Sequence, residues 1–453
     1  MRAWSGVMRT ALVLVLVLAT RGMARDVRPR TLYLALDAIP YETVKWMMDH
    51  GKLLPGFEPP AALVSTFPSF TTVAFTGLME PFGVTAAPGY EARFFSRDDN
   101  RIMGGGPISY HRIPFDWRDV WDWSLKSIIR KGWIYLDPFD MASHELSAAL
   151  AAFEAAPDDQ FLAYVMGTDA IGHFFGHEGT ERFLHLLDQE LRAMLNRQSG
   201  PVRVVVFSDH GMSEDGPFHN LKPLLERSMM EAGLTLADSL DGPRDAVMVP
   251  FGLISCAEVY CDPAAADVLA DALAAVPGVD LVMRRVDDLW EIRNRFRGRA
   301  IMGLRRGGDG NLWCAYQPLD GDPLAYGPVV EELRRTCAVR RERELEWFSA
   351  DDWLAMTWNR FYPDVIFRVA DSDRLVRNQA TVLLSCAPGY VAGATKTTFG
   401  AMLSRGWLQG SHGALWWKPS LGFITTNDAG WVRRDAFSYR DALTGFAGEY
   451  KKE

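Results

Sequence analysis

The feature that most constrains this chain is an apolar run at residues 202–208 that ends abruptly in Asp209, His210 and Gly211. The run is rich in β-branched residues, which predicts a buried strand. Ligands of open α/β sheets bind beyond the carboxyl ends of the strands. A strand that stops in aspartate and histidine therefore predicts one edge of an active site, although the same two residues could instead cap a helix or lie on the surface.

Two further apolar runs end in the same way. Residues 31–36 precede Asp37, and residues 160–166 are followed closely by Asp169 and then by His173. Three independent surface aspartates would not be expected to share this position, so the pattern indicates one common site. Asp169 and His173 are four positions apart, which places them on one face of a helix, a usual geometry for two ligands of one metal ion.

Segments with helical spacing separate these strands. The predicted helices are residues 41–51, 143–156 and 179–197. Strands that alternate with helices predict an α/β fold with a mostly parallel central sheet. Runs at residues 363–369 and 421–426 predict two later strands, and the Arg- and Gly-rich residues 293–311 are interpreted as a solvated loop.

The composition excludes one class of partner. Hydrophobic residues make up 48% of the chain, enough for a globular protein to bury a large core. The formal net charge is -9, the pI is near 5.6, and the sequence has no long basic run. The sequence therefore lacks the cluster of basic residues that binds a nucleic-acid polymer. A small phosphate-bearing ligand would need cations placed locally at its site.

The first 24 residues have the pattern of a secretory signal. Arg2 and Arg9 precede an apolar run at residues 11–19, and Gly22 and Ala24 provide small side chains at the two positions that a signal peptidase reads. The run is shorter than the ~20 residues of a membrane-spanning helix. We therefore expect an exported chain, periplasmic or extracellular, that begins at residue 25 and has no membrane span; an uncleaved anchor is the alternative.

Export also makes disulfide bonds chemically accessible. The cysteines are Cys256, Cys261, Cys314, Cys337 and Cys386. Their number is odd and their spacing does not resemble a zinc knuckle. We expect one or two disulfides among them and at least one free thiol.

The residue types at the strand ends indicate a metal centre. The candidate ligands are Asp37, Asp169, His173, Asp209, His210 and His412. Mixed carboxylate and imidazole ligation suits zinc, and also manganese or iron, better than calcium or magnesium. Six ligands are too many for one catalytic zinc ion and fit two, which can hold a phosphoryl group between them. Three carboxylates leave surplus positive charge on two dications, which favours an anionic substrate.

A candidate nucleophile lies just before a predicted helix. Ser65 and Thr66 follow a short apolar run, and both hydroxyls lie near the point where the helix is expected to begin. Backbone N–H groups at a helix N-terminus favour an incoming anion. A hydroxyl at that place is either a helix cap or a nucleophile, and the residues alone leave both readings open.

Taken in order, these motifs resemble those of the alkaline phosphatase superfamily, and most of all its type I phosphodiesterase/nucleotide pyrophosphatase branch. The motifs are Asp37 after a strand, Thr66-Phe67-Pro68, Asp169 to His173, Ser208 to Met212, and Ser411-His412-Gly413. The resemblance implies a three-layer α/β fold, a mostly parallel sheet with helices on both faces. It also implies a catalytic domain over residues 25–453 with a smaller subdomain inserted at about residues 217–405.

The resemblance further implies a site with two zinc ions, other divalent transition metals being the alternative. Asp37, Thr66, Asp209 and His210 would hold one ion, and Asp169, His173 and His412 the other. Thr66 would be the nucleophile and form a covalent phospho-threonine. The function implied is a secreted hydrolase of phosphate esters or phosphoanhydrides that acts on a small phosphorylated substrate. A phosphomonoesterase, a phosphotransferase or a non-catalytic binding protein with this fold are the alternatives.

Two departures from the branch concern the substrate side. Ser69 stands where the branch usually has asparagine, and residues 84–88 lack the asparagine that supports a phosphate oxygen. Tyr90, Arg93 and Asn100 are the nearby candidates for that role. The chain has no Cys/Ser-x-Pro-x-Arg segment at the nucleophile, which argues against a sulfatase.

Overall fold

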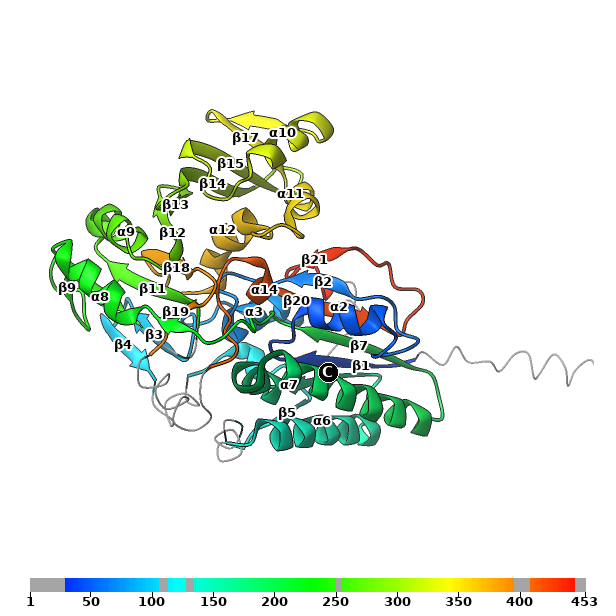
Figure 1. Cartoon of the computed structure of the whole chain (residues 1–453). Coiled ribbons are helices and arrows are strands. Elements are labelled where there is room, and N and C mark those ends of the chain that lie inside the picture. Colours follow the sequence, from blue (N-terminus) through cyan, green and yellow to red (C-terminus); the bar gives the residue numbers. More distant parts are fainter. Residues whose placement is uncertain are drawn as a thin grey trace, which may run out of the picture.

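Two large sheets organise the chain in the computed structural model, which describes residues 29–105, 113–127, 134, 136–249, 252, 254–394 and 408–444 (Figure 1). The predicted signal segment, residues 1–24, lies outside the described residues. Among the helices that are described, none is both long enough and apolar enough to cross a bilayer.

The first sheet has seven strands, and three of them place the strand-end aspartates. In spatial order it contains β21 (Ala436–Ser438), β2 (Ala61–Val64), β20 (Leu421–Thr426), β7 (Val202–Ser208), β1 (Arg30–Leu36), β6 (Gln160–Val165) and β5 (Trp123–Ser124). Strand β1 lies parallel to both β6 and β7, and Leu36 is opposite Val165 and Ser208. The three strands therefore end at one level, and the residues that follow them meet at one edge. Because β20 alone runs antiparallel to its neighbours, the sheet is mostly parallel, as predicted.

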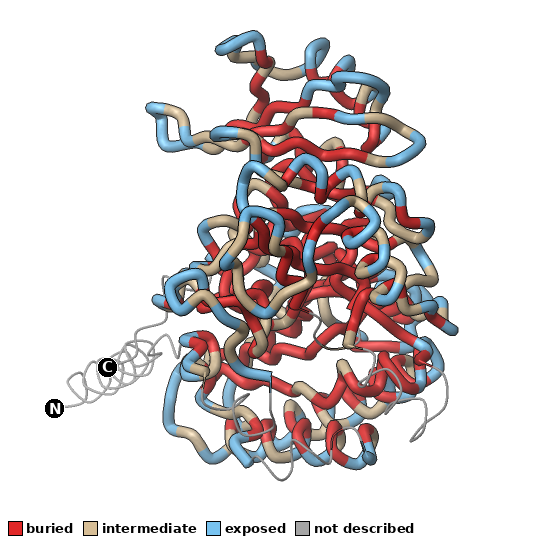
Figure 2. Tube along the Cα trace, turned by 90° about the vertical axis from the view of Figure 1, so that its left-hand side faces the viewer, coloured by how far each residue is buried: buried red, intermediate tan, exposed pale blue. Residues whose placement is uncertain are grey.

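Helices cover both faces of this sheet. Helices α2 (Tyr41–Asp49), α6 (Pro138–Ala155) and α7 (Gly167–Arg197) pack on one face, against residues such as Leu34 and Val206. Helices α3 (Thr71–Leu78) and α12 (Val365–Leu375) pack on the other face, where Ala35 and Val205 point. Both faces of β1 are thus buried, as expected for a parallel strand between helical layers. The layered α/β fold predicted from the alternating strands and helices is confirmed, and Figure 2 shows buried residues running through it.

The second sheet is built entirely from residues between Thr235 and Cys386. In spatial order it contains β16 (Arg340–Glu342), β17 (Leu345–Ser349), β15 (Leu312–Gly321), β14 (Gly298–Arg306), β13 (Leu289–Asn294), β12 (Val279–Val286), β18 (Val382–Cys386), β11 (Cys256–Cys261), β10 (Asp245–Met248) and β9 (Thr235–Leu236). It extends away from the first sheet, with α8 (Lys222–Glu231) and α9 (Ala266–Ala274) near one end (Figure 1). The insertion predicted at about residues 217–405 spans all ten strands; its status as a separate subdomain stays a prediction.

Two secondary-structure expectations are wrong. Residues 293–311 are not a loop, because they contain the end of β13 and the whole of β14, which buries Ala300 and Met302. Residues 363–369 are not a strand: α12 begins at Val365, directly after Asp364 turns the chain in a left-handed conformation with φ 46°. A short buried apolar run fits a buried helix as well as a strand, and periodicity cannot separate the two.

The expected disulfides are also absent, since all five cysteines are free. Cys256 and Cys261 lie at opposite ends of β11, roughly 16 Å apart for an extended strand, too far for a bridge. Cys256 lies opposite Ser385 on β18, so Cys386 points to the other face of the sheet. Regular strand pairing therefore keeps these thiols apart.

Candidate active site

The six predicted ligands lie together in two groups. The first group is Asp37, Asp209 and His210; the second group is Asp169, His173 and His412. Within each group, one ligand atom from every residue lies within 4.8 Å of the others. The rings of His210 and His412 stack with centroids 4.3 Å apart, so the two groups adjoin.

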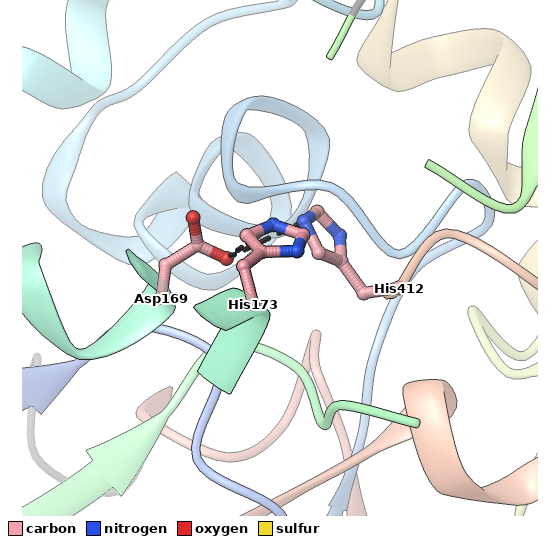
Figure 3. A group of neighbouring side chains, drawn as sticks. All are labelled: Asp169, His173 and His412. Carbon is pink, nitrogen blue, oxygen red and sulfur yellow. Dashed lines mark ion pairs between the residues drawn. The ribbon is translucent and has the colours of Figure 1, made fainter. Parts of the chain in front are cut away.

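The first sheet explains how the groups form. Asp37 and Asp209 directly follow β1 and β7, and Asp169 lies in the first turn of α7, just beyond β6. His173 follows one helical turn after Asp169. His412 comes from a distant segment that forms an isolated bridge with Ile254, just before β11 of the second sheet. Figure 3 shows Asp169 and His173 on α7 with His412 reaching them from this separate segment.

All three histidines are oriented alike. Their Nδ1 atoms face backbone carbonyls, His173 toward Gly410 at 2.8 Å, His210 toward Gly211 at 2.9 Å and His412 toward Ser69 at 3.0 Å. Donation of the Nδ1 hydrogen to these carbonyls leaves Nε2 as a bare acceptor directed at the aspartates. Histidines that bind metals almost always hold their second ring nitrogen in this manner.

The acceptor atoms in each group face one another. His173 Nε2 and His412 Nε2 lie 3.2 and 3.4 Å from Asp169 Oδ1, and His210 Nε2 lies 3.4 Å from Asp209 Oδ2. Two ligands of one tetrahedral zinc ion, with bonds of about 2.0–2.2 Å, are roughly 3.4 Å apart. Asp169 Oδ1 and Asp209 Oδ2 are buried and accept no hydrogen bond. A cation between these atoms would satisfy them, so the residues fit a metal ion in each group.

The protonation equilibria differ among the three histidines: burial lowers the pKa of His173, but the adjacent Asp169 outweighs it and raises that pKa overall. Burial lowers the pKa of His210 to about 4 and, with the neighbouring His210, that of His412 to about 3, so both imidazoles are neutral at pH 7. Burial raises the pKa of Asp37 well above its usual value, and Asp209 and Asp169 raise it further. Burial acts in the same direction on Asp169, but the adjacent histidines lower its pKa overall. Asp37 and Asp209, whose pKa values burial raises, need a cation nearby to remain ionised at neutral pH.

The structure does not bring Thr66 into either group. Its side chain is fully buried, and its hydroxyl donates to the carbonyl of Pro68 at 2.9 Å. This placement does not fit the role predicted for Thr66 as nucleophile and metal ligand, because the hydroxyl is engaged within its own turn. Ser65, the alternative, is also fully buried.

Thr71 brings a hydroxyl to the edge of the first group. It is the first residue of α3, it is half-buried, and its hydroxyl donates to Asp37 Oδ1 at 3.1 Å. The same oxygen lies 3.4 Å from His210 Nε2. Several hydroxyls crowd this segment, and the sequence alone did not single out Thr71.

Two further residues support the first group. The hydroxyl of Tyr164 donates to Asp37 Oδ2, and the backbone N–H of Ala38 donates to Asp209 Oδ1 at 3.2 Å. No sequence signal pointed to Tyr164, which lies within β6. Of the three candidate oxyanion donors, Asn100 donates to the carbonyl of Leu240, the Tyr90 hydroxyl accepts from the Ala380 N–H, and Arg93 begins β3 (Arg93–Ser96).

Comparisons with known proteins identify a matching family and solved structures with a similar fold. The family model for type I phosphodiesterase / nucleotide pyrophosphatase matches residues 59–264. A phosphonoacetate hydrolase from Sinorhizobium meliloti 1021, solved in complex with phosphonoformate, has a TM-score of 0.50 and 13% identity, covering 93% of this chain and 96% of its own. Murine ectonucleotide pyrophosphatase / phosphodiesterase 5 has a TM-score of 0.46 and 11% identity, covering 93% and 94%. A search of curated proteins by sequence finds no match.

The matched segment contains Thr71 and four of the six grouped ligands, and the structural likeness to phosphonoacetate hydrolase supports an alkaline-phosphatase-like fold. The family is metal-dependent and acts on phosphate esters, so this chain is an enzyme of the phosphoric ester hydrolase class. The resemblance predicted from the motifs is confirmed: residues 59–264 match the type I phosphodiesterase / nucleotide pyrophosphatase family, a member of the alkaline phosphatase superfamily.

Proposed function

We propose that this protein is an exported phosphodiesterase or nucleotide pyrophosphatase that uses Thr71 as its nucleophile and two zinc ions as cofactors. The observation that carries the proposal is the Thr71 hydroxyl, which lies against Asp37 and His210 at the edge of the first group. A small phosphorylated substrate fits the family and the surplus positive charge expected at the site.

The metal part of the proposal assigns one ion to each group. Asp37, Asp209 and His210 would hold the first ion, and Asp169, His173 and His412 the second. When bound, such ions would lower the pKa of a nucleophilic hydroxyl and neutralise charge on phosphoryl oxygens.

The protein's own groups would hold and orient the reactants. Asp37 accepts the Thr71 hydrogen bond and so fixes the direction of the hydroxyl oxygen. That oxygen would attack phosphorus as its proton passes to Asp37, and the bond from phosphorus to the leaving-group oxygen would break, so that a phospho-threonine would form. Water would then hydrolyse the phospho-threonine, which returns the free Thr71 hydroxyl and releases the phosphoryl product. Phe70, the residue before α3, has no side chain that can cap the helix, so the first backbone N–H groups of α3 are free to bind a phosphoryl oxygen. These groups offer a replacement for the asparagine that residues 84–88 lack.

A matched pair of variants tests the nucleophile. Thr71→Val and Thr66→Val each remove one hydroxyl with little change in shape. We expect Thr71→Val to lose turnover by about a thousandfold or more, because the nucleophile is gone, while the zinc content of the purified protein is retained. We expect Thr66→Val to keep turnover near wild type, because its hydroxyl bonds only to Pro68. The reverse result would identify Thr66 as the nucleophile.

Substrate preference is tested on the same preparation. The rates with a bis-aryl phosphate diester and with the corresponding aryl monoester are compared under one set of conditions. A diester preference is expected, and a clear monoester preference would replace the phosphodiesterase assignment by a phosphomonoesterase. Cell fractionation of a producing strain tests export, which should leave a mature chain that begins near residue 25.

A further inference from the structure

Arg368 on α12 is a fully buried cation whose side-chain hydrogen bonds all go to backbone carbonyls, and the buried Asp364 carboxyl also interacts with its charge. Its Nη2 and Nε donate to the carbonyl of Thr66 at 3.0 and 3.4 Å, and its Nη1 donates to those of Pro363 and Leu415, both at 3.0 Å. The side chain has no exposed surface. Burial lowers the pKa of Arg368 to about 10, so the guanidinium is still charged at neutral pH. A buried charge is costly, and a fold tolerates it only when its donors are well satisfied.

Two of these carbonyls belong to the segments that build the candidate active site. Thr66 begins the nucleophile loop, which we define as residues 66–71. Leu415 lies in the His412 segment, which we define as residues 408–416. A single guanidinium on α12 therefore connects the loop that ends in Thr71 to the segment that carries His412.

The same two segments are also joined closer to the site. Ser69 in the nucleophile loop accepts from His412 Nδ1 through its carbonyl at 3.0 Å and from the Gly413 N–H through its hydroxyl at 3.1 Å. Gly413 has φ 102°, and a Cβ at this position would lie 2.5 Å from the Phe70 ring. The two segments thus contact at an inner point around Ser69 and at an outer point around Arg368.

We propose that Arg368 is a positioning residue that fixes the nucleophile loop relative to the His412 segment. The hydrogen bonds of Arg368 reach neither the ligand groups nor Thr71. Arg368 acts through the backbone of the nucleophile loop and the backbone of the His412 segment. The planar guanidinium suits this role because it directs donors to carbonyls on different sides, which the single ammonium of lysine cannot do. The inference rests on the proposed role of Thr71 for its catalytic consequence, but its structural part does not.

The test compares Arg368→Lys with Arg360→Lys in the full-length protein. Arg360 is an exposed arginine near the start of α12 that donates to the carbonyl of Met356, so the control makes the same chemical change outside the contact. Hydrogen exchange is measured for peptides that cover residues 66–71 and 408–416. We expect Arg368→Lys to speed exchange in both peptides, and Arg360→Lys to change neither.

Steady-state kinetics on the same samples test the catalytic consequence. We expect Arg368→Lys to lower kcat by about tenfold or more with KM changed less than about threefold, because misplaced reacting groups reduce the rate more than binding. In Arg368→Ala, added guanidinium ion should restore part of the lost kcat. Unchanged exchange and unchanged kcat in Arg368→Lys would overturn the proposal. Faster exchange with unchanged kcat in the same variant would overturn its catalytic part. Failure of both Arg368 variants to fold, judged by circular dichroism, would make the residue purely structural and would also overturn it.

These outcomes are separable from failure of the proposed function. If Thr71 is not the nucleophile, Thr71→Val will retain activity, whereas the exchange measurement on the nucleophile loop and the His412 segment reports their contact whichever residue reacts.

Discussion

At the residue scale, the buried Glu258 should make the stability of the fold depend on pH. It lies on β11 and is 5% exposed, and burial, followed by repulsion from Glu91, raises its pKa to about 8. Burial likewise raises the pKa of Glu91 to about 7. An acid whose pKa is higher in the folded state holds an extra proton there. Its contribution to stability is therefore greatest below its unfolded pKa and declines as pH rises through the folded value.

This sign leads to a prediction for Glu258→Gln. The variant removes the ionisable group, so its stability relative to wild type should rise between pH 5 and pH 8.5 by on the order of 3 kcal/mol. Urea unfolding of metal-free protein at the two pH values measures the difference. The exposed Glu231→Gln on α8 serves as control and should show no such change. An equal effect of Glu258→Gln at both pH values would contradict the prediction.

The residues of the candidate site differ in how far the sequence could identify them. The aspartates Asp37, Asp169 and Asp209 were predictable, because each follows an apolar strand and parallel strands end at one edge. Thr71 was not predictable in the same way. Hydroxyls crowd the stretch around it, and only the path of the chain decides that the Thr66 hydroxyl turns to Pro68 while that of Thr71 reaches Asp37. Tyr164 gave no sequence signal, because a tyrosine in a buried strand is ordinary core.

At the element scale, a kink in α7 separates the ligand-bearing turn from the rest of the helix. Gly176 has φ 56° and ψ -147° inside α7, three residues after His173. Only glycine adopts this backbone conformation without strain. The kink lets the first turns of α7 present Asp169 and His173 to the site while the remainder packs along the sheet.

We predict that Gly176→Ala strains this kink and disturbs the second group. The cost in free energy of unfolding should be about 1–3 kcal/mol, and zinc affinity should fall because Asp169 and His173 shift together. Gly200→Ala, in the loop that follows α7, is the matched control, since a Cβ there meets nothing within 4 Å. Thermal unfolding and zinc titration measure both effects. Unchanged zinc affinity in Gly176→Ala would show that the kink does not position the ligands.

The elements themselves were predictable where periodicity and length agreed. The run at residues 202–208 coincides with β7, and that at residues 421–426 coincides with β20. The run at residues 363–369 failed because residues 365–367 are consecutive buried apolar residues, and so short an apolar run shows no period that separates a helix from a strand. The interpretation of residues 293–311 as a solvated loop failed because arginines such as Arg299 and Arg306 occupy exposed positions of the antiparallel strand β14.

At the scale of the whole molecule, the candidate site draws its parts from both sheets. The first sheet supplies the three aspartates at its carboxyl edge. The His412 segment is tied to the second sheet, since Ser255 donates to the His412 carbonyl at 2.7 Å and Leu415 donates to the Ser385 hydroxyl at 3.0 Å. Long-range contacts of this kind cannot be read from local sequence patterns, so the role of the second sheet at the site emerged only from the structure.

This division of the site predicts how metal and stability are coupled. The purified protein should hold two zinc ions per chain by elemental analysis, and His412→Ala should hold one, because it breaks only the second group.

Removal of zinc should lower Tm, since carboxylates buried near one another lose the cation that offsets their repulsion, and added zinc should restore it. At a free zinc concentration about a hundred times Kd, binding stabilises the fold by roughly 2.7 kcal/mol per site. His412→Ala should therefore show a smaller zinc-dependent rise in Tm than wild type. An equal rise in both proteins, or fewer than one ion in wild type, would contradict the assignment of one ion to each group.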